Sequence, residues 1–225
     1  FIHYQLGAPT EKYAYTDESG NVIKYNCRFP DPSRGKTFRQ CDSTGLTWSV
    51  EGLPTVPYHL PNLINADSVC VVEGEKDVHT CEKLGLIATC SGNGAKSWTD
   101  EVAGYLYGKK EIVIIPDRDE PGGEYAQKVA ESLHCRVDSI RVVELPDLPE
   151  KGDVSDFVER YSDPEEAAER LAVIIENTPP YEPKKIPSLD DVIIEARDFQ
   201  KIEVSEPKRY QHPWLKEDSI NLLSG

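Results

Sequence analysis

Two apolar runs that each end in acidic residues decide the fold: SVCVV at residues 68–72, followed by EGEKD at 73–77, and EIVIIP at residues 111–116, followed by DRDEPG at 117–122. Continuous Val/Ile runs of this length are typical of strands that are buried on both faces, as in a parallel sheet flanked by helices. The acids would then lie at the carboxyl ends of adjacent strands, where open α/β sheets bind their ligands.

Three carboxylates, those of Glu73, Asp117 and Asp119, are expected to meet across one crevice at this edge of the sheet. Such a cluster stays ionised most easily with a divalent cation among its members. Oxygen-only ligands favour Mg²⁺ or Mn²⁺. Without metal, the clustering of like charges implies raised pKa values, so metal affinity should fall below neutral pH.

The pairing of these motifs carries a family resemblance. A strand ending in Glu-Gly, followed one βα unit later by a strand ending in Asp-x-Asp-x-x-Gly, resembles the Toprim domain shared by DnaG-type primases, topoisomerases and certain nucleases. The variants EGEKD and PDRDEPG most resemble the primase part of phage and plasmid primase-helicases. The resemblance implies a compact Rossmann-like α/β fold over residues 67–177. It also implies a DNA primase, which makes RNA primers from ribonucleotides on single-stranded DNA with Mg²⁺ or Mn²⁺.

Roles for the first acids follow from this resemblance. Asp117 and Asp119 are expected to bind the metal directly, because alternate residues past a strand end can both turn toward one ion. Glu73 would be either a metal ligand or the acid/base group on the primer hydroxyl, and the sequence does not choose between them. Asp77 matches the last acid of the family's Glu-Gly-x-x-Asp pattern.

A further acidic pair, Asp153 and Asp156, follows the expected strand 139–143. It resembles the pair that primases carry there, and would complete a second metal position. Asp153 can also be read as the N-cap of a helix over residues 154–161. Both readings can hold, because a cap side chain at a strand-to-helix turn also faces the crevice.

Residues 1–66 predict a small β-rich basic subdomain, with one hairpin joining 13–15 to 22–25 and a second joining 37–39 to 46–48. Residues 21–40 hold five Lys or Arg and one acid. This basic island suits a phosphate backbone or a triphosphate, or is a solvated hairpin edge protected by charge.

The candidates for binding template or nucleotide are all basic: Arg28, Lys36, Arg39 and Lys96. The first three belong to the basic island, which resembles the basic subdomain that precedes the Toprim core in primases. Lys96 lies in the loop SGNGAKS at 91–97, which lacks the Walker spacing. Lys96 would contact a phosphate or is a plain surface lysine.

The remaining pattern predicts alternating helices and strands. Strands are expected at 86–89 and 139–143, and helices at 58–66, 75–84, 99–107, 122–133, 154–161 and 164–177. A Pro-rich linker from 178 to 187 should mark a domain boundary. Beyond it we expect a short helix over 189–199 and an ending, at 219–225, that resembles the first strand of a RecA-like helicase. A helicase domain of a longer chain is therefore an expected partner.

Composition excludes several classes of protein. A net charge of −15 argues against coating nucleic acid by charge alone. No apolar run approaches the roughly 20 residues of a membrane helix, so no membrane partner is expected. The six cysteines form no Cys-x-x-Cys pair, which makes a zinc site in these residues unexpected. Cys70 and Cys81 fall on buried positions and predict core thiols in a reducing cytoplasm.

Two other functions share the acidic motifs. A Toprim nuclease or topoisomerase fragment would need a partner nuclease domain or a nucleophilic Tyr, and none of the eleven tyrosines is singled out by its context. A non-catalytic Toprim module would bind nucleotide or metal, or only tether a helicase.

Overall fold

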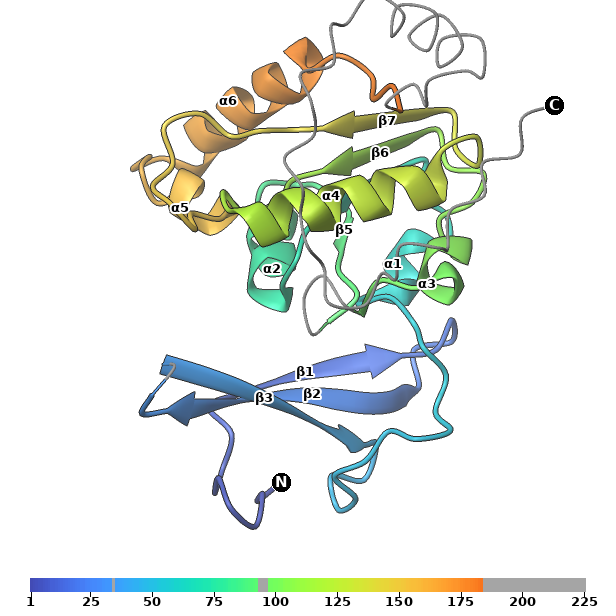
Figure 1. The fold of residues 1–225 in the computed structure, drawn as a ribbon, viewed down its shortest axis with the longest axis vertical. Helices are drawn as coiled ribbons and strands as arrows, with labels where there is room; N and C mark the ends of the chain where they lie inside the picture. Colours follow the sequence, from blue (N-terminus) through green and yellow to red (C-terminus); the bar gives the residue numbers. More distant parts are fainter. Residues whose placement is uncertain (34, 93–96, 184–225) are drawn as a thin grey trace, which may run out of the picture. The chain divides into compact units, whose positions relative to one another are not determined.

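A computed structural model describes residues 1–33, 35–92 and 97–183 of the chain (Figure 1). The described residues form one compact unit that ends at Pro183. It contains a three-stranded antiparallel sheet and a four-stranded parallel sheet. The predicted end of the Pro-rich linker, the helix over 189–199 and the helicase-like ending lie outside the described residues, as does Lys96.

The antiparallel sheet is a meander of β1 (Glu11–Thr16), β2 (Val22–Asp31) and β3 (Gly35–Asp42). The turn between β1 and β2 is closed by the carboxylate of Asp17, which accepts hydrogen bonds from the backbone N–H groups of Ser19 and Asn21. The first predicted hairpin is thereby confirmed.

The second predicted hairpin is wrong in its pairing. β3 pairs with β2, from Lys24 opposite Asp42 to Asp31 opposite Gly35. Residues 46–48 form no strand, because Asp42 closes a turn in which its carboxylate accepts the backbone N–H of Thr47. The polar residues after β3 therefore form a turn that ends the sheet. The hairpin reversal lies before β3, between Asp31 and Gly35.

The parallel sheet contains β4 (Ser68–Val71), β5 (Ala88–Thr89), β6 (Glu111–Ile114) and β7 (Ser139–Val142), in the order β5-β4-β6-β7. β4 and β6 are the central strands, and their ends stay in register, with Val71 opposite Ile114. Both acidic motifs therefore leave the sheet side by side. This confirms the predicted fold class.

Helices cover both faces of the parallel sheet (Figure 1). They are α1 (Leu60–Leu63), α2 (Glu75–Lys83), α3 (Asp100–Gly104), α4 (Glu120–Leu133), α5 (Val154–Val158) and α6 (Pro164–Asn177). Buried side chains of α2, α5 and α6 pack on one face, and those of α3 and α4 pack on the other, while α1 contributes Leu60 to the first cluster and Leu63 to the second. All six helices were expected, but α1, α3 and α5 are shorter than predicted. None of the helices in the described ranges has the length and apolar content needed to cross a lipid bilayer.

The thiols of Cys70 and Cys81 are buried, and their sulfur atoms lie 3.9 Å apart between β4 and α2. Their predicted place in the core is confirmed. After α6 the chain returns to β7, where the backbone N–H of Tyr181 donates to the carbonyl of Ile140 at 2.7 Å. This contact covers part of the β7 edge, which would otherwise present unpaired backbone groups.

Candidate active site at the carboxyl end of the parallel sheet

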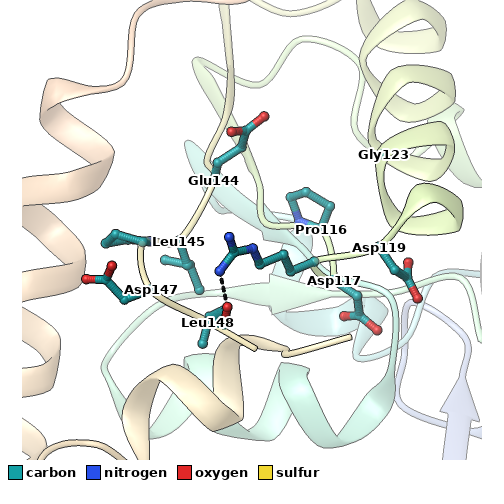
Figure 2. Close-up of a pocket in the computed structure, with 10 residues that line it drawn as sticks. Pro116, Asp117, Asp119, Gly123, Glu144, Leu145, Asp147 and Leu148 are labelled. Carbon is teal, nitrogen blue, oxygen red and sulfur yellow. Dashed lines mark hydrogen bonds between the residues drawn. The ribbon is translucent and has the colours of Figure 1, made fainter. Parts of the chain in front are cut away.

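The acidic residues are placed by the way each strand passes into the next helix. After β4 the chain turns at Gly74, and Glu75 begins α2. After β6, Asp117 lies in the connecting loop, and Asp119 is the N-cap of α4. The Asp119 Oδ1 atom accepts the backbone N–H of Gly122 at 2.8 Å. Figure 2 shows the carboxylates of Asp117 and Asp119 pointing to the same side of this loop.

Glu73 reaches from the end of β4 to the loop after β6. Its Oε1 atom accepts the backbone N–H of Asp117 at 3.2 Å. Burial, followed by the charges of Glu73, Asp77, Asp153 and Asp119, raises the pKa of Asp117 to about 8. Burial also raises the pKa of Glu73, more than the hydrogen bond from Asp117 lowers it, and the charges of Asp119 and Asp77 add to the rise. The predicted rise in pKa is confirmed for Glu73 and Asp117, although burial rather than like charge is its largest cause.

Asp77 and Asp153 extend this acidic group toward α5. Asp77 is buried, and its Oδ1 atom accepts the hydroxyl of Ser155 at 2.7 Å. Burial raises the pKa of Asp77 to about 6, against the effect of this hydrogen bond. Asp153 caps α5, as one of the two predicted readings required, and exchanges side-chain-to-backbone hydrogen bonds with Asp156. Asp156 therefore supports the cap.

A cavity of about 420 Å³ separates these acids from the antiparallel sheet. Four of the predicted acids line it: Glu73, Asp77, Asp117 and Asp153. Arg28 and Lys36 line it from the opposite side, and such a volume suits a small-molecule ligand. Side chains alternate along a strand, so Arg39, opposite Cys27, lies on the other face of the sheet. Of the basic candidates in the antiparallel sheet, Arg28 and Lys36 therefore face the acids, and Arg39 does not.

A second cavity, of about 490 Å³, lies on the other side of the β6 loop (Figure 2). Asp117 and Asp119 line it together with Arg118. The Arg118 guanidinium donates to the carbonyl of Leu148, while its backbone N–H donates to Gly152 and its carbonyl accepts from Lys151, both at 2.9 Å. Arg118 thus ties the loop after β7 to the loop after β6. That contact positions Asp153.

Sequence reasoning missed Arg118 and Lys76, the two basic residues inside the acidic motifs. The Nζ atom of Lys76 lies 2.8 Å from Oδ2 of Asp153. The only sequence signal for either residue was its place between acids, which is equally typical of a solvated surface charge.

The carboxylates have the chemistry of a site for a hard divalent cation, because their oxygens are the ligands that Mg²⁺ and Mn²⁺ prefer. In the described ranges, however, no group of three or more His, Cys, Asp or Glu side chains is gathered closely enough to hold a metal ion. Glu73 and Asp117 share one cavity, and Asp117 and Asp119 share the other. The three carboxylates that were expected to meet across one crevice are thus divided between two cavities, and a cation bound by all three would need side-chain rotation around the β6 loop.

Gly122 allows the close approach of α4 to this loop, which leads to a first prediction. A Cβ atom at Gly122 would overlap the carbonyl oxygen of Asp117 and lie 2.9 Å from Oε1 of Glu73. We expect Gly122→Ala to lower the free energy of unfolding by about 1–3 kcal/mol, because overpacking displaces the loop. Gly123→Ala is the matched control, since a Cβ atom there meets nothing within 4 Å. Urea unfolding of both variants measures the difference, and equal stabilities would contradict the close approach.

Comparison with known proteins finds relatives of this chain in sequence and in fold. Residues 70–158 match the family model described as Toprim-like. The Gene 57 protein of Mycobacterium phage D29 is 31% identical over 100 residues, which cover 41% of this chain and 62% of that protein.

Two solved structures share the fold at low sequence identity. The Aquifex aeolicus primase, with its zinc-binding and RNA polymerase domains, has a TM-score of 0.56 at 16% identity, over 84% of this chain and 43% of that one. A DnaG primase catalytic domain bound to single-stranded DNA has a TM-score of 0.56 at 18% identity, over 75% and 53% of the two chains. The chain thus spans less than two thirds of each of these three proteins. The resemblance carried by the two acidic motifs is confirmed: residues 70–158 match the Toprim-like family, and the described fold is that of DnaG-type primase catalytic cores.

Proposed function

We propose that this chain is the catalytic core of a DNA primase, which makes RNA primers from ribonucleotides on a single-stranded DNA template. One observation carries the proposal. The acidic carboxyl ends of β4 and β6 face Arg28 and Lys36 of the antiparallel sheet across a single cavity. A site that joins nucleotides needs both charges, because basic groups bind phosphates and carboxylates bind the metal.

The reaction is the attack of a 3′-hydroxyl oxygen on the α-phosphorus of a ribonucleoside triphosphate. A new oxygen–phosphorus bond forms, and the bond to the β-phosphate breaks, so that pyrophosphate leaves. Bound Mg²⁺ or Mn²⁺ supplies charge stabilisation at the attacking and leaving oxygens. Asp117, Asp119 and Glu73 would hold one ion, and Asp77 with Asp153 would hold a second.

The side chains of the cavity have separate roles in this proposal. Arg28 and Lys36 would hold the triphosphate in line with the attacking oxygen. The raised pKa of Glu73 suits it to accept the proton of the primer hydroxyl when it is not itself a ligand. Nucleotide binding by Arg39 and Lys96, and metal binding by Asp156, stay predictions.

The partners follow from the same proposal. A DnaG catalytic domain with this fold has been solved bound to single-stranded DNA, which supports such a template here. A helicase domain in the same longer chain, a phage- or plasmid-like primase-helicase and a cytoplasmic location are the context expected from the sequence.

The test is synthesis of oligoribonucleotides on single-stranded DNA in Mg²⁺ or Mn²⁺, compared between the native chain and Asp119→Asn. Asn is also a good N-cap, so this change removes the charge and keeps the hydrogen bond from Gly122. We expect a loss of roughly a hundredfold or more. Asp163→Asn is the matched control, because Asp163 caps α6 in the same way, with its Oδ1 atom 2.9 Å from the backbone nitrogen of Glu165.

Other results would favour the alternatives. Nicking of plasmid DNA without primer synthesis would indicate a Toprim nuclease. Metal binding without either activity would leave a non-catalytic module. Equal activity of Asp119→Asn and Asp163→Asn would contradict the assigned role of Asp119.

A further inference from the structure

Lys76 lies in the first turn of α2 and forms an ion pair across the rim of the acidic cavity. Its Nζ atom is 2.8 Å from Oδ2 of Asp153, the N-cap of α5. The Lys76 side chain is 51% exposed, and that of Asp153 is 18% exposed. A flexible and half-exposed cation is therefore held against a carboxylate of the proposed site.

The hydrogen bonds of the other acids set Asp153 apart. Three of them each give one oxygen to the protein: Glu73 to the Asp117 backbone, Asp77 to Ser155, and Asp119 to Gly122. Asp153 gives Oδ1 to the backbone N–H of Asp156 and Oδ2 to Lys76. Of these four carboxylates, Asp153 is the one with both oxygens in hydrogen bonds to other described residues.

We propose that the ammonium group of Lys76 is a built-in cation at Asp153, which a divalent metal ion must displace before Asp153 can bind it. This inference rests on the proposed function, which places Asp153 at a second metal position. The ammonium and the metal compete for the same oxygen. They also repel each other, because both are positive.

The energetics allow such a displacement. An exposed ion pair stabilises a protein by about 0–1 kcal/mol, so the metal can release Lys76. In the metal-free protein the lysine offsets part of the repulsion among the acids, since the charge of Asp153 raises the pKa of both Asp77 and Asp117. Lys76 thereby stabilises the metal-free site and lowers the affinity of that site for the second metal ion.

The test is direct Mn²⁺ binding to the full chain, measured by calorimetry and by the electron paramagnetic resonance signal of free Mn²⁺. Lys76→Met keeps the length of the side chain and removes its charge. We expect its weaker Mn²⁺ site to bind about three- to tenfold more tightly than that of the native chain. Lys76→Arg keeps the charge and should bind Mn²⁺ no more tightly than the native chain.

Lys110→Met is the matched control. Lys110 forms an exposed ion pair with Asp67, with a distance of 2.6 Å between Nζ and Oδ2. Both residues lie at the amino ends of the parallel strands, away from the acids. This variant changes the net charge by the same amount and should leave Mn²⁺ binding unchanged.

Each remaining outcome overturns a defined claim. Equal Mn²⁺ affinity in Lys76→Met and Lys110→Met overturns the inference. Weaker nucleotide binding in Lys76→Met at unchanged Mn²⁺ affinity also overturns it, and assigns Lys76 to a phosphate instead. A native chain that binds no Mn²⁺ overturns the proposed function together with the inference, so the two failures are distinguishable.

Discussion

Asp117→Asn is expected to abolish primer synthesis and, at the same time, to raise the stability of the metal-free protein. Asp117 lies where the charges of the site converge, and its pKa is raised to about 8 by burial and by four neighbouring carboxylates. No hydrogen bond joins its carboxylate to another described residue. The amide of the Asp117→Asn variant therefore removes a negative charge that burial and the neighbouring carboxylates disfavour, and it breaks no hydrogen bond of the side chain. The same change removes a proposed metal ligand.

The direction of the pH dependence follows from the raised pKa. A carboxyl group that titrates near 8 in the folded chain and near 4 in the unfolded chain binds its proton more tightly when folded. Ionisation of Asp117 therefore destabilises the fold as the pH rises from about 4 to 8, and the penalty is constant above that range. Because the group is partly exposed, we expect Asp117→Asn to gain roughly 2–3 kcal/mol at pH 8, and less at pH 5.

Thermal unfolding in a chelator at pH 5 and pH 8 measures this gain as a difference in Tm. A gain of this size should raise Tm by roughly 5–10 °C at pH 8. Asp67→Asn is the control, since Asp67 is exposed and lies at the opposite end of β4. Added Mn²⁺ should then stabilise the native chain more than the Asp117→Asn variant. A Tm difference that does not change with pH would contradict the assigned pKa.

The sequence predicts those site residues that directly follow the ends of neighbouring strands. Val and Ile runs identify β4 and β6 as buried strands, and the acids that follow them must share one edge of the sheet. Asp77 and Asp153 could be added because Glu-Gly-x-x-Asp and the strand 139–143 fix their places in the chain. The raised pKa values followed from this crowding, but their main cause, burial, needed the packed structure.

The remainder depends on contacts between distant parts of the sequence. The β2–β3 pairing is set by a reversal between Asp31 and Gly35, in the run DPSRG, which is as rich in turn residues as the DSTG run at 42–45. The two signals compete in the sequence, and the later one misplaced the second hairpin. That register also decides which basic side chains face the acids, and it separates Lys36 from Arg39. No local sequence pattern predicts the ion pair of Lys76 with Asp153, because the two residues are far apart in the chain.

Glu75→Ala is expected to destabilise the protein strongly. Glu75 is 4% exposed, and its Oε1 atom accepts two hydrogen bonds from the antiparallel sheet. The Tyr15 hydroxyl donates at 2.8 Å and the Asn26 amide at 2.7 Å. Burial lowers the pKa of Lys24, and the Glu75 charge opposes this shift. One carboxylate at the start of α2, four residues after the end of β4, thus joins this part of the chain to the antiparallel sheet.

Alanine at this position would leave two buried hydrogen-bond donors without their acceptor, and the buried ammonium group of Lys24 without the nearby negative charge that favours it. Unpaired buried polar groups are destabilising by about 1–3 kcal/mol each, and more when charged. We expect Glu75→Ala to lower the free energy of unfolding by roughly 3–4 kcal/mol. It should also weaken the hydrogen-exchange protection of β1 and β2 more than that of β4 and β6, because it breaks the link between the sheets.

Two milder variants separate the parts of this effect. Tyr15→Phe removes one donor and keeps the ring in the core, so we expect a loss of about 1 kcal/mol. Glu75→Gln keeps an acceptor oxygen and removes the charge beside Lys24, and should lie between Tyr15→Phe and Glu75→Ala. Urea unfolding of the three variants gives the order. If Glu75→Ala were no less stable than Tyr15→Phe, the carboxylate would not be the link, and the two sheets would be held together by the apolar contacts of Tyr13, Tyr15 and Tyr58 instead.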